Sequence, residues 1–505
     1  MSSIPLPLTA DIIIAGGGPA GATLGRLLAE LGYRVVIFEK RRFPRHQIGE
    51  SLTPQILPIL DFLSVRSRVE AAGFPRMAGH TVCWGSNQPR TSYYSEDHSR
   101  RGFQVWREDF DSLLLHHARA GGVRVFEEHS VDHVQFADDG VIVAASHGTA
   151  TARFFVDATG HAGILARQQL RQRDQVFQTL AINAYWQSAS GPPGVDFANT
   201  LIEAYENGLV WSVPLHNGLR NVTLLIDWEL GTSIRQSGLQ EFYLTELRQA
   251  PYIGQFLHDA RLAIPPRAFD ATWHTAARFV TERFLLVGDA GVFLDPLSSE
   301  GVHKAMASAI TSAAVINTIL QRPSMTPHAV DFYEDAQRSL YEAYYRQSAA
   351  YYREEQRWPD APFWRRRSHN QFPVPSSRFP VPEQETSAFR TPHSAFRTST
   401  IVSHLSVGPD VRVEPRPVIE GPFVEVRDVL LTPRHPRGIR FLDGITLPTL
   451  IQIVECETAV AQIIPGYLSS PAGQHCTPEA VRQMLARLYY EGVLTAIAPD
   501  ESRSG

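Results

Sequence analysis

Residues 11–21 read Asp11-Ile12-Ile13-Ile14-Ala15-Gly16-Gly17-Gly18-Pro19-Ala20-Gly21, an apolar run followed at once by a glycine-rich turn. The apolar run predicts a buried strand, and Pro19 is typical of the first turn of a helix. Glycines at this junction let the backbone turn tightly and approach a pyrophosphate, whose charge the helix N-terminus stabilises. The stretch therefore predicts the first strand, turn and helix of a Rossmann-like dinucleotide-binding domain.

The next predicted strand ends in an acidic residue. Val35-Val36-Ile37-Phe38-Glu39 is an apolar run, and Glu39 lies about twenty residues beyond the glycines, the spacing expected for a carboxylate that binds a ribose hydroxyl. Lys40 follows it and belongs at the adenosine end of the site. Since this unit suits NAD as well as FAD, a second signature has to decide between them.

The second signature lies near residue 289 and favours FAD. Phe284-Leu285-Leu286-Val287 predicts a buried strand that delivers Gly288-Asp289-Ala290 to a turn. Asp289 is well placed there for a ribityl chain. Residues 295–305 then read Asp295-Pro296-Leu297-Ser298-Ser299-Glu300-Gly301-Val302-His303-Lys304-Ala305. A helix follows, with a face of small residues suited to close packing: Ala305, Ala309, Ser312, Ala313 and Ile316.

These segments together resemble the FAD-dependent, halogenase-like branch of the flavin monooxygenases, over residues 11–367. Further motifs carry the same resemblance: Phe43-Pro44-Arg45, Ile48-Gly49-Glu50-Ser51-Leu52, Val105-Trp106-Arg107-Glu108-Asp109-Phe110-Asp111-Ser112-Leu113-Leu114, Val156-Asp157-Ala158-Thr159-Gly160 with Leu165-Ala166-Arg167, Gly208-Leu209-Val210-Trp211-Ser212-Val213-Pro214-Leu215, and Pro362-Phe363-Trp364-Arg365-Arg366-Arg367. The resemblance implies an α/β fold, with a Rossmann-like FAD-binding domain of the p-hydroxybenzoate hydroxylase type and a β-sheet substrate domain.

The resemblance also implies which residues bind the cofactor. In that family Arg107 and Asp289 contact FAD, and the backbone after Asp295-Pro296 lies beside the isoalloxazine ring. The expected cofactor-binding residues are Gly16, Gly18, Ala20, Gly21, Glu39, Lys40, Arg45, Ser51, Arg107, Asp289, Gly301 and Val302. We expect reducing equivalents from NAD(P)H, directly or through a separate flavin reductase.

The chain departs from the halogenases in its lysines. Halogenases pass the oxidised halogen to the substrate through a lysine, usually in the segment that matches residues 72–79, and this chain has none there. Of its 47 lysines and arginines, only Lys40 and Lys304 are lysines. Arginine is no substitute, because its guanidinium stays protonated and offers no amine nucleophile.

Glu300 is a second departure, since halogenase-like sequences usually have Ser or Thr before the glycine that matches Gly301. Backbone N–H groups there hold the halide. A carboxylate about 5 Å from chloride costs roughly 3 kcal/mol at an effective dielectric of about 20, near a hundredfold in affinity. Pairing with Lys304 at i+4 is the alternative fate of Glu300. The third departure is Leu209, where halogenases have the first tryptophan of a Trp-x-Trp pair, so that only Trp211 remains.

The pattern therefore favours a monooxygenase that hydroxylates an aromatic ring, an indole or a phenol, held on a peptide or carrier protein. One example is a tryptophan side chain in tryptophylquinone cofactor biogenesis. The candidate catalytic residues are Glu300, His303 and Lys304. Glu300 is the first candidate base because an apolar pocket favours the protonated form of a carboxylate, and His46 is a further, weaker candidate. Trp211, Phe293 and Pro296 are the expected pocket walls.

Three other functions stay open on the sequence. One is a halogenase in which Lys304 or another strategy replaces the missing lysine. Halide-dependent product formation would identify this function. Another is an ene-reductase of the geranylgeranyl reductase type, whose Gly-Glu-Gly turn resembles Ser299-Glu300-Gly301 and which turns over without oxygen. The last is a peptide-binding chaperone in which FAD is only structural.

Composition fits a soluble, cytoplasmic enzyme. A 505-residue chain with 43% hydrophobic and 20% charged residues predicts two or three globular units. It has no apolar run of membrane-spanning length and no charged leader. Its three cysteines have no metal-binding spacing, so we expect no metal, and a net charge of −5 gives no reason to expect nucleic acid.

The expected domains are discontinuous in sequence. Residues 1–80, 103–175 and 272–350 form the FAD-binding domain, and residues 81–102 and 176–271 the substrate-binding sheet. Residues 351–400 read as a Pro/Arg-rich linker, with Phe372-Pro373-Val374-Pro375 repeated at 379–382 and Ser387-Ala388-Phe389-Arg390-Thr391 repeated at 394–398.

Residues 401–505 predict a small winged-helix-like C-terminal domain. Thr477-Pro478-Glu479 begins a helix that ends before Gly492, and residues 493–497 read as a wing strand. DNA binding is not expected, because this region has 9 arginines and no lysine against 12 acids. It serves either to dock a peptide or carrier-bound substrate or as a lid or packing domain.

Overall fold

The computed structural model describes residues 8–165, 170–187, 198–368 and 403–497. Contacts divide the chain into two compact units, Met1–Phe372 with Gly421–Phe423, and Pro373–Glu420 with Val424–Gly505. Each unit has its own hydrophobic core. The Phe-Pro-Val-Pro and Ser-Ala-Phe-Arg-Thr repeats lie outside the described residues.

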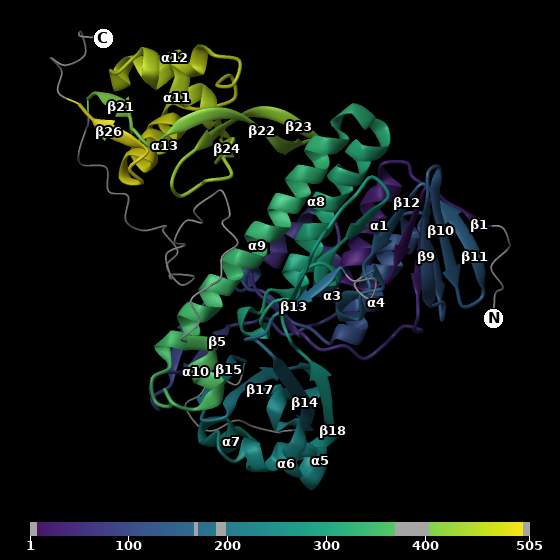
Figure 1. The fold of residues 1–505 in the computed structure, drawn as a ribbon. Helices are drawn as coiled ribbons and strands as arrows, with labels where there is room; N and C mark the ends of the chain where they lie inside the picture. Colours follow the sequence, from purple (N-terminus) through teal and green to yellow (C-terminus); the bar gives the residue numbers. More distant parts are fainter. Residues whose placement is uncertain (1–7, 166–169, 188–197, 369–402, 498–505) are drawn as a thin grey trace. The chain divides into compact units, whose positions relative to one another are not determined.

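A five-stranded parallel sheet lies in the first unit (Figure 1). Its strands are, in spatial order, β20 (Phe284–Leu286), β12 (Phe154–Asp157), β2 (Ile12–Ala15), β3 (Val35–Glu39) and β8 (Arg124–Glu127). The strands predicted near residues 11–15, 35–39 and 284–287 are thus confirmed as β2, β3 and β20. Because parallel strands end at the same edge of a sheet, the turns after β2, β12 and β20 open side by side.

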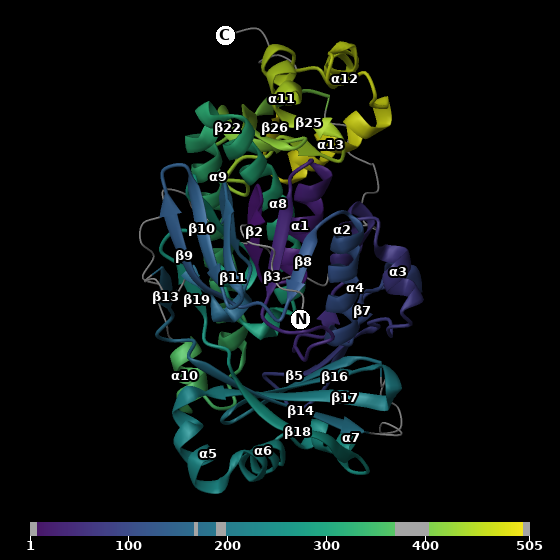
Figure 2. The ribbon, with the colours of Figure 1, turned by 90° about the vertical axis from the view of Figure 1, so that its right-hand side faces the viewer.

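Helices cover this parallel sheet, and small residues let two of them pack closely. α1 (Pro19–Glu30) contacts α8 (Gly301–Gln321), which buries the small-residue face predicted from the sequence. α4 (Arg107–Ala120) packs on α1, and α9 (Thr326–Glu354) packs on α8. Figure 2 shows α1 and α4 beside the strands. None of the helices in the described ranges has the length and apolar character that crossing a membrane needs.

Three smaller elements complete this part of the unit. A four-stranded sheet has the order β1 (Leu8–Thr9), β11 (Gly148–Ala152), β10 (Gly140–Ala145) and β9 (Val131–Ala137). Two short pairs, β4 (Ser51–Leu52) with β7 (Phe103–Gln104) and β13 (Arg171–Arg173) with β19 (His274–Ala276), lie in the connections. Helices α2 (Ile56–Phe62) and α3 (Arg66–Ala71) follow β4.

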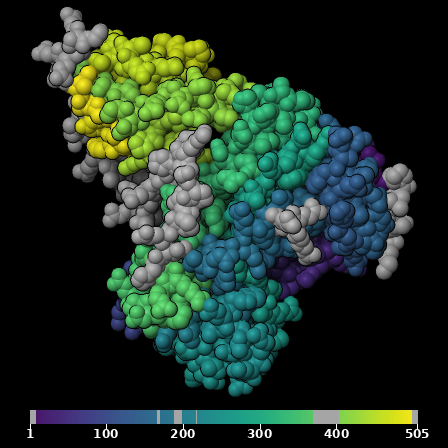
Figure 3. Space-filling view, in the orientation of Figure 1, coloured from purple at the N-terminus to yellow at the C-terminus, as the bar shows by residue number. Residues whose placement is uncertain are grey.

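A seven-stranded sheet forms the rest of the unit. Its order is β18 (Arg261–Asp270), β14 (Thr179–Gln187), β17 (Leu219–Asp227), β16 (Gly208–Pro214), β15 (Thr200–Tyr205), β5 (Gly79–Cys83) and β6 (Arg90–Tyr93). Helices α5 (Gly231–Ser237), α6 (Leu239–Leu247) and α7 (Pro251–Leu257) lie on one side. Their surface, with that of β17 and β18, is teal in Figure 3.

The two faces of this sheet have different surroundings. Ile182, Val210 and Leu224 belong to the core shared with α6 and α7. Because successive side chains alternate between faces, Tyr185, Asn221 and Trp211 lie on the opposite face. The hydrogen bonds of Tyr185 and Asn221 to Glu50 turn that face toward the segment that follows β3.

The predicted linker begins too early. Residues 351–354 are the last turn of α9, and residues 362–368 form α10 (Pro362–Ser368), which packs against α9. Within α10 Arg367 is fully buried and donates to Asp227 and Thr179. The composition suggested a linker, but Arg367 pairs with the buried Asp227 of the sheet, and Arg366 pairs with the exposed Glu229.

The second unit combines short strands with three helices. Its strands are β21 (Leu405–Val407), β22 (Arg412–Glu420), β23 (Phe423–Leu431), β24 (Phe441–Leu442), β25 (Ile445–Thr446) and β26 (Leu494–Ala496), and its helices are α11 (Leu447–Cys456), α12 (Val460–Ser469) and α13 (Pro478–Tyr490). As predicted, α13 begins after a Thr477 cap, whose hydroxyl accepts from the Ala480 N–H. The strand predicted at 493–497 is β26, which pairs with β21.

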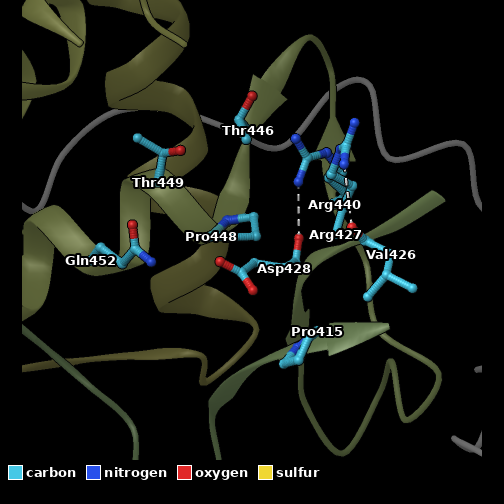
Figure 4. Close-up of a pocket in the computed structure, with 9 residues that line it drawn as sticks. All are labelled: Pro415, Val426, Arg427, Asp428, Arg440, Thr446, Pro448, Thr449 and Gln452. Carbon is cyan, nitrogen blue, oxygen red and sulfur yellow. Dashed lines mark hydrogen bonds between the residues drawn. The ribbon is translucent and has the colours of Figure 1, made fainter. Parts of the chain in front are cut away.

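A pocket of about 380 Å³ lies in the second unit, between the β22–β23 hairpin and the first half of α11 (Figure 4). Arg427 and Arg440 line it, together with Asp428. Both arginines are also close to Glu420, with Arg427 Nε 2.5 Å and Arg440 Nη2 4.0 Å from its carboxylate. The pocket is therefore polar but has no excess of either charge.

Candidate functional site

The turn after β2 has a backbone that only glycine fits. Gly16 has φ +101°, and a Cβ there would lie 2.4 Å from the Ala158 carbonyl oxygen. A Cβ on Gly21 would lie 2.0 Å from the Gly16 oxygen. No side chain caps the N-terminus of α1 at Gly18. These features suit a pyrophosphate placed against the first amides of α1, so the residues present fit a dinucleotide.

A chain of ion pairs runs from the end of β3 to α4. Glu39, 4% exposed, accepts from the Gly17 N–H at 2.8 Å, and Arg45 Nε lies 3.8 Å from its other oxygen. Arg45 Nη1 lies 3.4 Å from Asp111. Asp111 also accepts two hydrogen bonds, of 2.8 and 3.0 Å, from the buried Arg107. The chain thus fixes the segment between β3 and β4 at the predicted cofactor site.

The remaining predicted cofactor residues have different surroundings. Ala20 and Val302 are buried at the starts of α1 and α8, while Lys40 is exposed. Ser51 donates to Gln104 at 3.0 Å inside the β4–β7 pair. Gly301 is the first residue of α8, and a Cβ there would meet no atom within 4 Å.

Glu50 forms a buried network that the sequence did not single out. Its carboxylate accepts from Tyr185 Oη and Asn221 Nδ2, both at 2.8 Å, and from the Gly49 N–H at 3.0 Å. Burial, and then the charge of Glu50, raises the pKa of Tyr185 well above its usual range. The partners lie 135 and 171 residues away in sequence, so no local motif could have identified them.

Lys304 pairs with Asp289, so the alternative in which it pairs with Glu300 at i+4 is not borne out. Its Nζ lies 2.7 Å from Asp289 Oδ1 and also donates to the Val292 carbonyl. The lysine side chain is 4% exposed, whereas that of Asp289 is 31% exposed. The i+4 spacing suggested the wrong partner, because the turn after β20 brings a second carboxylate to the same helix end.

Glu300 lies at the N-terminus of α8 in a polar cluster. It is 9% exposed, and its Oε2 lies 2.7 Å from Nδ1 of His303. The Thr53 hydroxyl donates to Oε1 at 3.3 Å. With the Gln55 amide turned so that its nitrogen faces Glu300, that nitrogen donates to the two carboxylate oxygens at 3.1 and 3.2 Å. The structure therefore brings together two of the three predicted catalytic residues, Glu300 and His303.

Two tyrosines lie within the electrostatic range of Glu300. Burial, and then the Glu300 charge, raises the pKa of Tyr94 to about 12 and shifts the pKa of Tyr344 in the same direction. Both phenols stay protonated near neutral pH and can donate hydrogen bonds. Neither was predicted, since Tyr94 follows β6 and Tyr344 belongs to α9, far from Glu300 in sequence.

The Asp295-Pro296 turn is held from α9. Asp295 is buried, accepts from the Leu297 N–H at 3.0 Å, and accepts from Tyr352 Oη at 2.7 Å. Burial raises the pKa of Asp295 above its ordinary value. Pro296 begins the short helix that precedes Ser299, a residue with φ +53°. The bond to Tyr352 thus supports the loop expected beside the flavin ring.

Tyr352→Phe is expected to lower the free energy of unfolding by about 1–3 kcal/mol, because it removes the hydroxyl that donates a 2.7 Å hydrogen bond to the buried Asp295 carboxylate. Urea unfolding of the FAD-loaded protein measures this. Tyr351→Phe is the matched control on the same helix, since the Tyr351 hydroxyl only accepts a 3.3 Å bond from Gln347. Equal effects of the two substitutions would show that the Asp295 bond is not the cause.

Two histidines, the buried His274 and the partly exposed His161, lie beside Asp289. His274 Nε2 is 2.9 Å from the Asp289 carbonyl oxygen, and the His274 ring stacks on Phe293 at 5.6 Å. His161 packs edge-on against both rings. Burial, and then the charge of Arg171, lowers the pKa of His161 to about 4 and that of His274 to about 3. Both imidazoles are therefore neutral at physiological pH.

This neutrality predicts loss of stability in acid. In the unfolded state both imidazoles take up a proton as the pH falls below about 6.5. In the folded state His161 takes up its proton only near pH 4, and His274 only near pH 3. Stability from these groups is present above pH 6.5 and falls as the pH drops toward 4, by about 1.4 kcal/mol per pH unit for each proton. His161→Asn is expected to reduce that slope between pH 6.5 and 5, measured by urea unfolding; an unchanged slope contradicts the assignment.

The predicted pocket walls do not all lie in one place. Phe293 packs on the histidines beside Asp289, and Pro296 belongs to the turn held by Tyr352. Trp211 lies in β16 opposite Thr223, on the face that also carries Tyr185. At the segment expected to carry a halogenase lysine, Met77 is buried and Arg76 turns to Glu70 and the Arg101 carbonyl.

The sequence model described as tryptophan halogenase matches residues 11–99 and 85–411. A protein named tryptophan 2-halogenase from Chondromyces crocatus is 34% identical over 340 residues, 65% of each chain, so the match spans slightly less than two thirds of that relative. The flavin-dependent halogenase armH4 from Armillaria mellea is 32% identical over 66% of this chain and 70% of its own length.

Two solved structures are similar over nearly the whole chain. The flavin-dependent halogenase CmlS is 26% identical with a TM-score of 0.79, covering 97% of this chain and 96% of its own. The peptidyl tryptophan dihydroxylase QhpG, described as essential for tryptophylquinone cofactor biogenesis, is 25% identical with a TM-score of 0.69, covering 95% and 99%. Similar proteins therefore include both halogenating and hydroxylating enzymes.

Proposed function

The chain belongs to the tryptophan halogenase family and is a FAD-dependent oxidoreductase, and from this premise we propose that it hydroxylates an aromatic ring, an indole or a phenol. The supporting observation is the carboxylate–imidazole pair at the start of α8, where Glu300 Oε2 lies 2.7 Å from His303 Nδ1. A buried acid with an adjacent imidazole can take up a proton and pass it on.

Reduced FAD, when bound, supplies the activation of dioxygen. Oxygen transfer to a ring carbon leaves that carbon bonded to both oxygen and hydrogen, and the ring regains aromaticity when a base removes the hydrogen as a proton. Glu300 is the base and takes this proton on a carboxylate oxygen. His303, 25% exposed, accepts it from Glu300 and releases it toward solvent. Thr53 and Gln55 orient the carboxylate through their hydrogen bonds.

The same charge disfavours halide. Glu300 is the N-cap residue of α8 and carries a carboxylate where halogenases usually have a hydroxyl. Neither of the two lysines replaces the one missing near residue 77. Lys40 is exposed just after β3, and Lys304 binds Asp289. The oxygen atom, rather than a halogen, is therefore what reaches the acceptor.

The acceptor is proposed to be an aromatic side chain on a peptide or carrier protein. QhpG is described as acting on peptidyl tryptophan, and a relative from Pseudomonas fluorescens, 29% identical, is named as a chlorinase of a pyrrole held on a peptidyl carrier protein. Electrons come from NAD(P)H, directly or through a separate flavin reductase.

Halogenation of an aromatic acceptor is the second candidate function, and the names of the relatives favour it. It requires a group other than the usual lysine to pass the oxidised halogen to the substrate.

Single turnover separates the two functions. FAD-loaded protein is reduced chemically and mixed with oxygen, bromide and a panel of free and peptide-bound indoles and phenols, and product mass is read. A gain of one oxygen atom supports hydroxylation. A bromine isotope pair overturns the proposal and supports halogenation. Turnover of reduced protein without oxygen would instead identify an ene-reductase.

A further inference from the structure

Lys304 is unusual among the basic residues of this chain. It is one of two lysines among 47 lysines and arginines, and its side chain is 4% exposed. A buried ammonium is costly unless it is paired and hydrogen-bonded. Its partners are Asp289 Oδ1 at 2.7 Å and the Val292 carbonyl. The carboxylate of Asp289 therefore compensates the cost of burying the Lys304 ammonium.

Asp289 stands at the centre of several charged and polar groups. It follows β20 at the edge where the turns of β2 and β12 also open. Electrostatic interactions link it to Arg107, His161 and His274, and Lys304 contacts it directly. Its side chain stays 31% exposed, so one side of the carboxylate is available to the cofactor.

A bare carboxylate at this place would repel FAD. The cofactor carries a doubly charged pyrophosphate, which the free amides of α1 attract at the turn after β2. An uncompensated charge about 10 Å from another unit charge changes affinity by roughly tenfold at an effective dielectric of about 20. A cation beside Asp289 reduces this penalty; Arg107 interacts with the carboxylate electrostatically, and Lys304 contacts it directly.

We propose that Lys304 is the internal counter-ion of Asp289, a positioning residue that neutralises and orients this carboxylate so that FAD binds tightly. The role is separate from acid–base chemistry and from transfer of a halogen. It holds equally whether the product is hydroxylated or halogenated.

The test measures the dissociation constant of FAD with apoprotein, by titration with flavin fluorescence. Lys304→Met leaves Asp289 unpaired and is expected to weaken FAD binding by about tenfold or more, with the loss shrinking at high salt. The double variant Lys304→Met with Asp289→Asn has the same net charge as the native pair. We expect it to bind FAD more tightly than Lys304→Met alone, because the repulsive charge is gone.

Either of two results overturns the proposal. One is Lys304→Met binding FAD as tightly as the native protein. The other is a double variant that binds no better than Lys304→Met, which means that the lysine acts only by packing. Thermal unfolding of each apoprotein monitors folding. If Lys304→Met does not fold, the double variant carries the test, and its failure to bind FAD within about a hundredfold of the native constant counts against the counter-ion. No acceptor or oxygen is involved, so the result is independent of the hydroxylation proposal.

Discussion

Glu300→Gln is expected to lower the yield of hydroxylated product in single turnover by about a hundredfold, the smaller end of what a general base contributes. The amide keeps the size of the side chain and can still bond to Thr53, but it takes up no proton. Rapid quenching of reduced, FAD-loaded protein with oxygen and an accepted aromatic substrate measures the rate of product formation. The dissociation constant of FAD is expected to stay within about threefold of the native value, because Glu300 pairs with His303, whereas Asp289 pairs with Lys304.

Thr53→Val is the matched control for this substitution. It removes a 3.3 Å hydrogen bond to Glu300 Oε1 and leaves the carboxylate in place. We expect a loss of less than about tenfold, because this hydrogen bond is long and the contacts of the carboxylate with Gln55 and His303 remain. If Glu300→Gln forms product at the native rate, another group removes the proton and the assignment of the base is wrong.

Glu300→Thr is expected to raise bromide affinity by about a hundredfold. It removes a charge placed about 5 Å from the amides that open α8, where the resemblance to halogenases puts the halide, and that charge is worth roughly 3 kcal/mol at an effective dielectric of about 20. Threonine is also a favourable N-cap residue, so the helix end keeps its stability. Bromide titration of the FAD-loaded protein, followed by flavin absorbance, gives the dissociation constant.

Glu300→Gln separates charge from shape in the same titration. It neutralises position 300 without shortening the side chain, so a purely electrostatic cause predicts a similar gain for both variants. A gain for threonine alone points to steric exclusion. No gain in either variant means that the carboxylate is not what keeps halide out, which removes the main physical argument against halogenation.

Local sequence patterns were sufficient for the strands and turns at which the cofactor-binding residues are expected. Gly16, Glu39 and Asp289 each lie at or just after the end of a strand that the apolar runs predict, and parallel strands bring such ends together. The backbone geometry of a strand–turn–helix unit depends on nearby residues, so it can be predicted without knowing which distant residues are in contact. The winged-helix-like reading of the second unit stays a prediction beyond its α13 cap and its β21–β26 pair.

Side-chain pairing was less predictable, because it depends on residues far apart in the chain. Helical spacing suggested Glu300 with Lys304, yet the lysine turns to Asp289 fifteen residues earlier, and Glu300 instead meets His303 and Thr53. The acceptor of Tyr185 is 135 residues away. Composition assigned residues 351–368 to a linker, whereas Arg367 of α10 pairs with the buried Asp227.

The first turn of α8 carries both Glu300 and Lys304, one directed to the polar cluster with His303 and the other to Asp289. The proposed cofactor-positioning residue and the proposed base are therefore hard to change independently. Under the two proposed roles, a substitution that rotates this helix alters cofactor retention and proton removal together, so variants selected for new acceptors are expected to accumulate changes on the sheet around Trp211 rather than in α8.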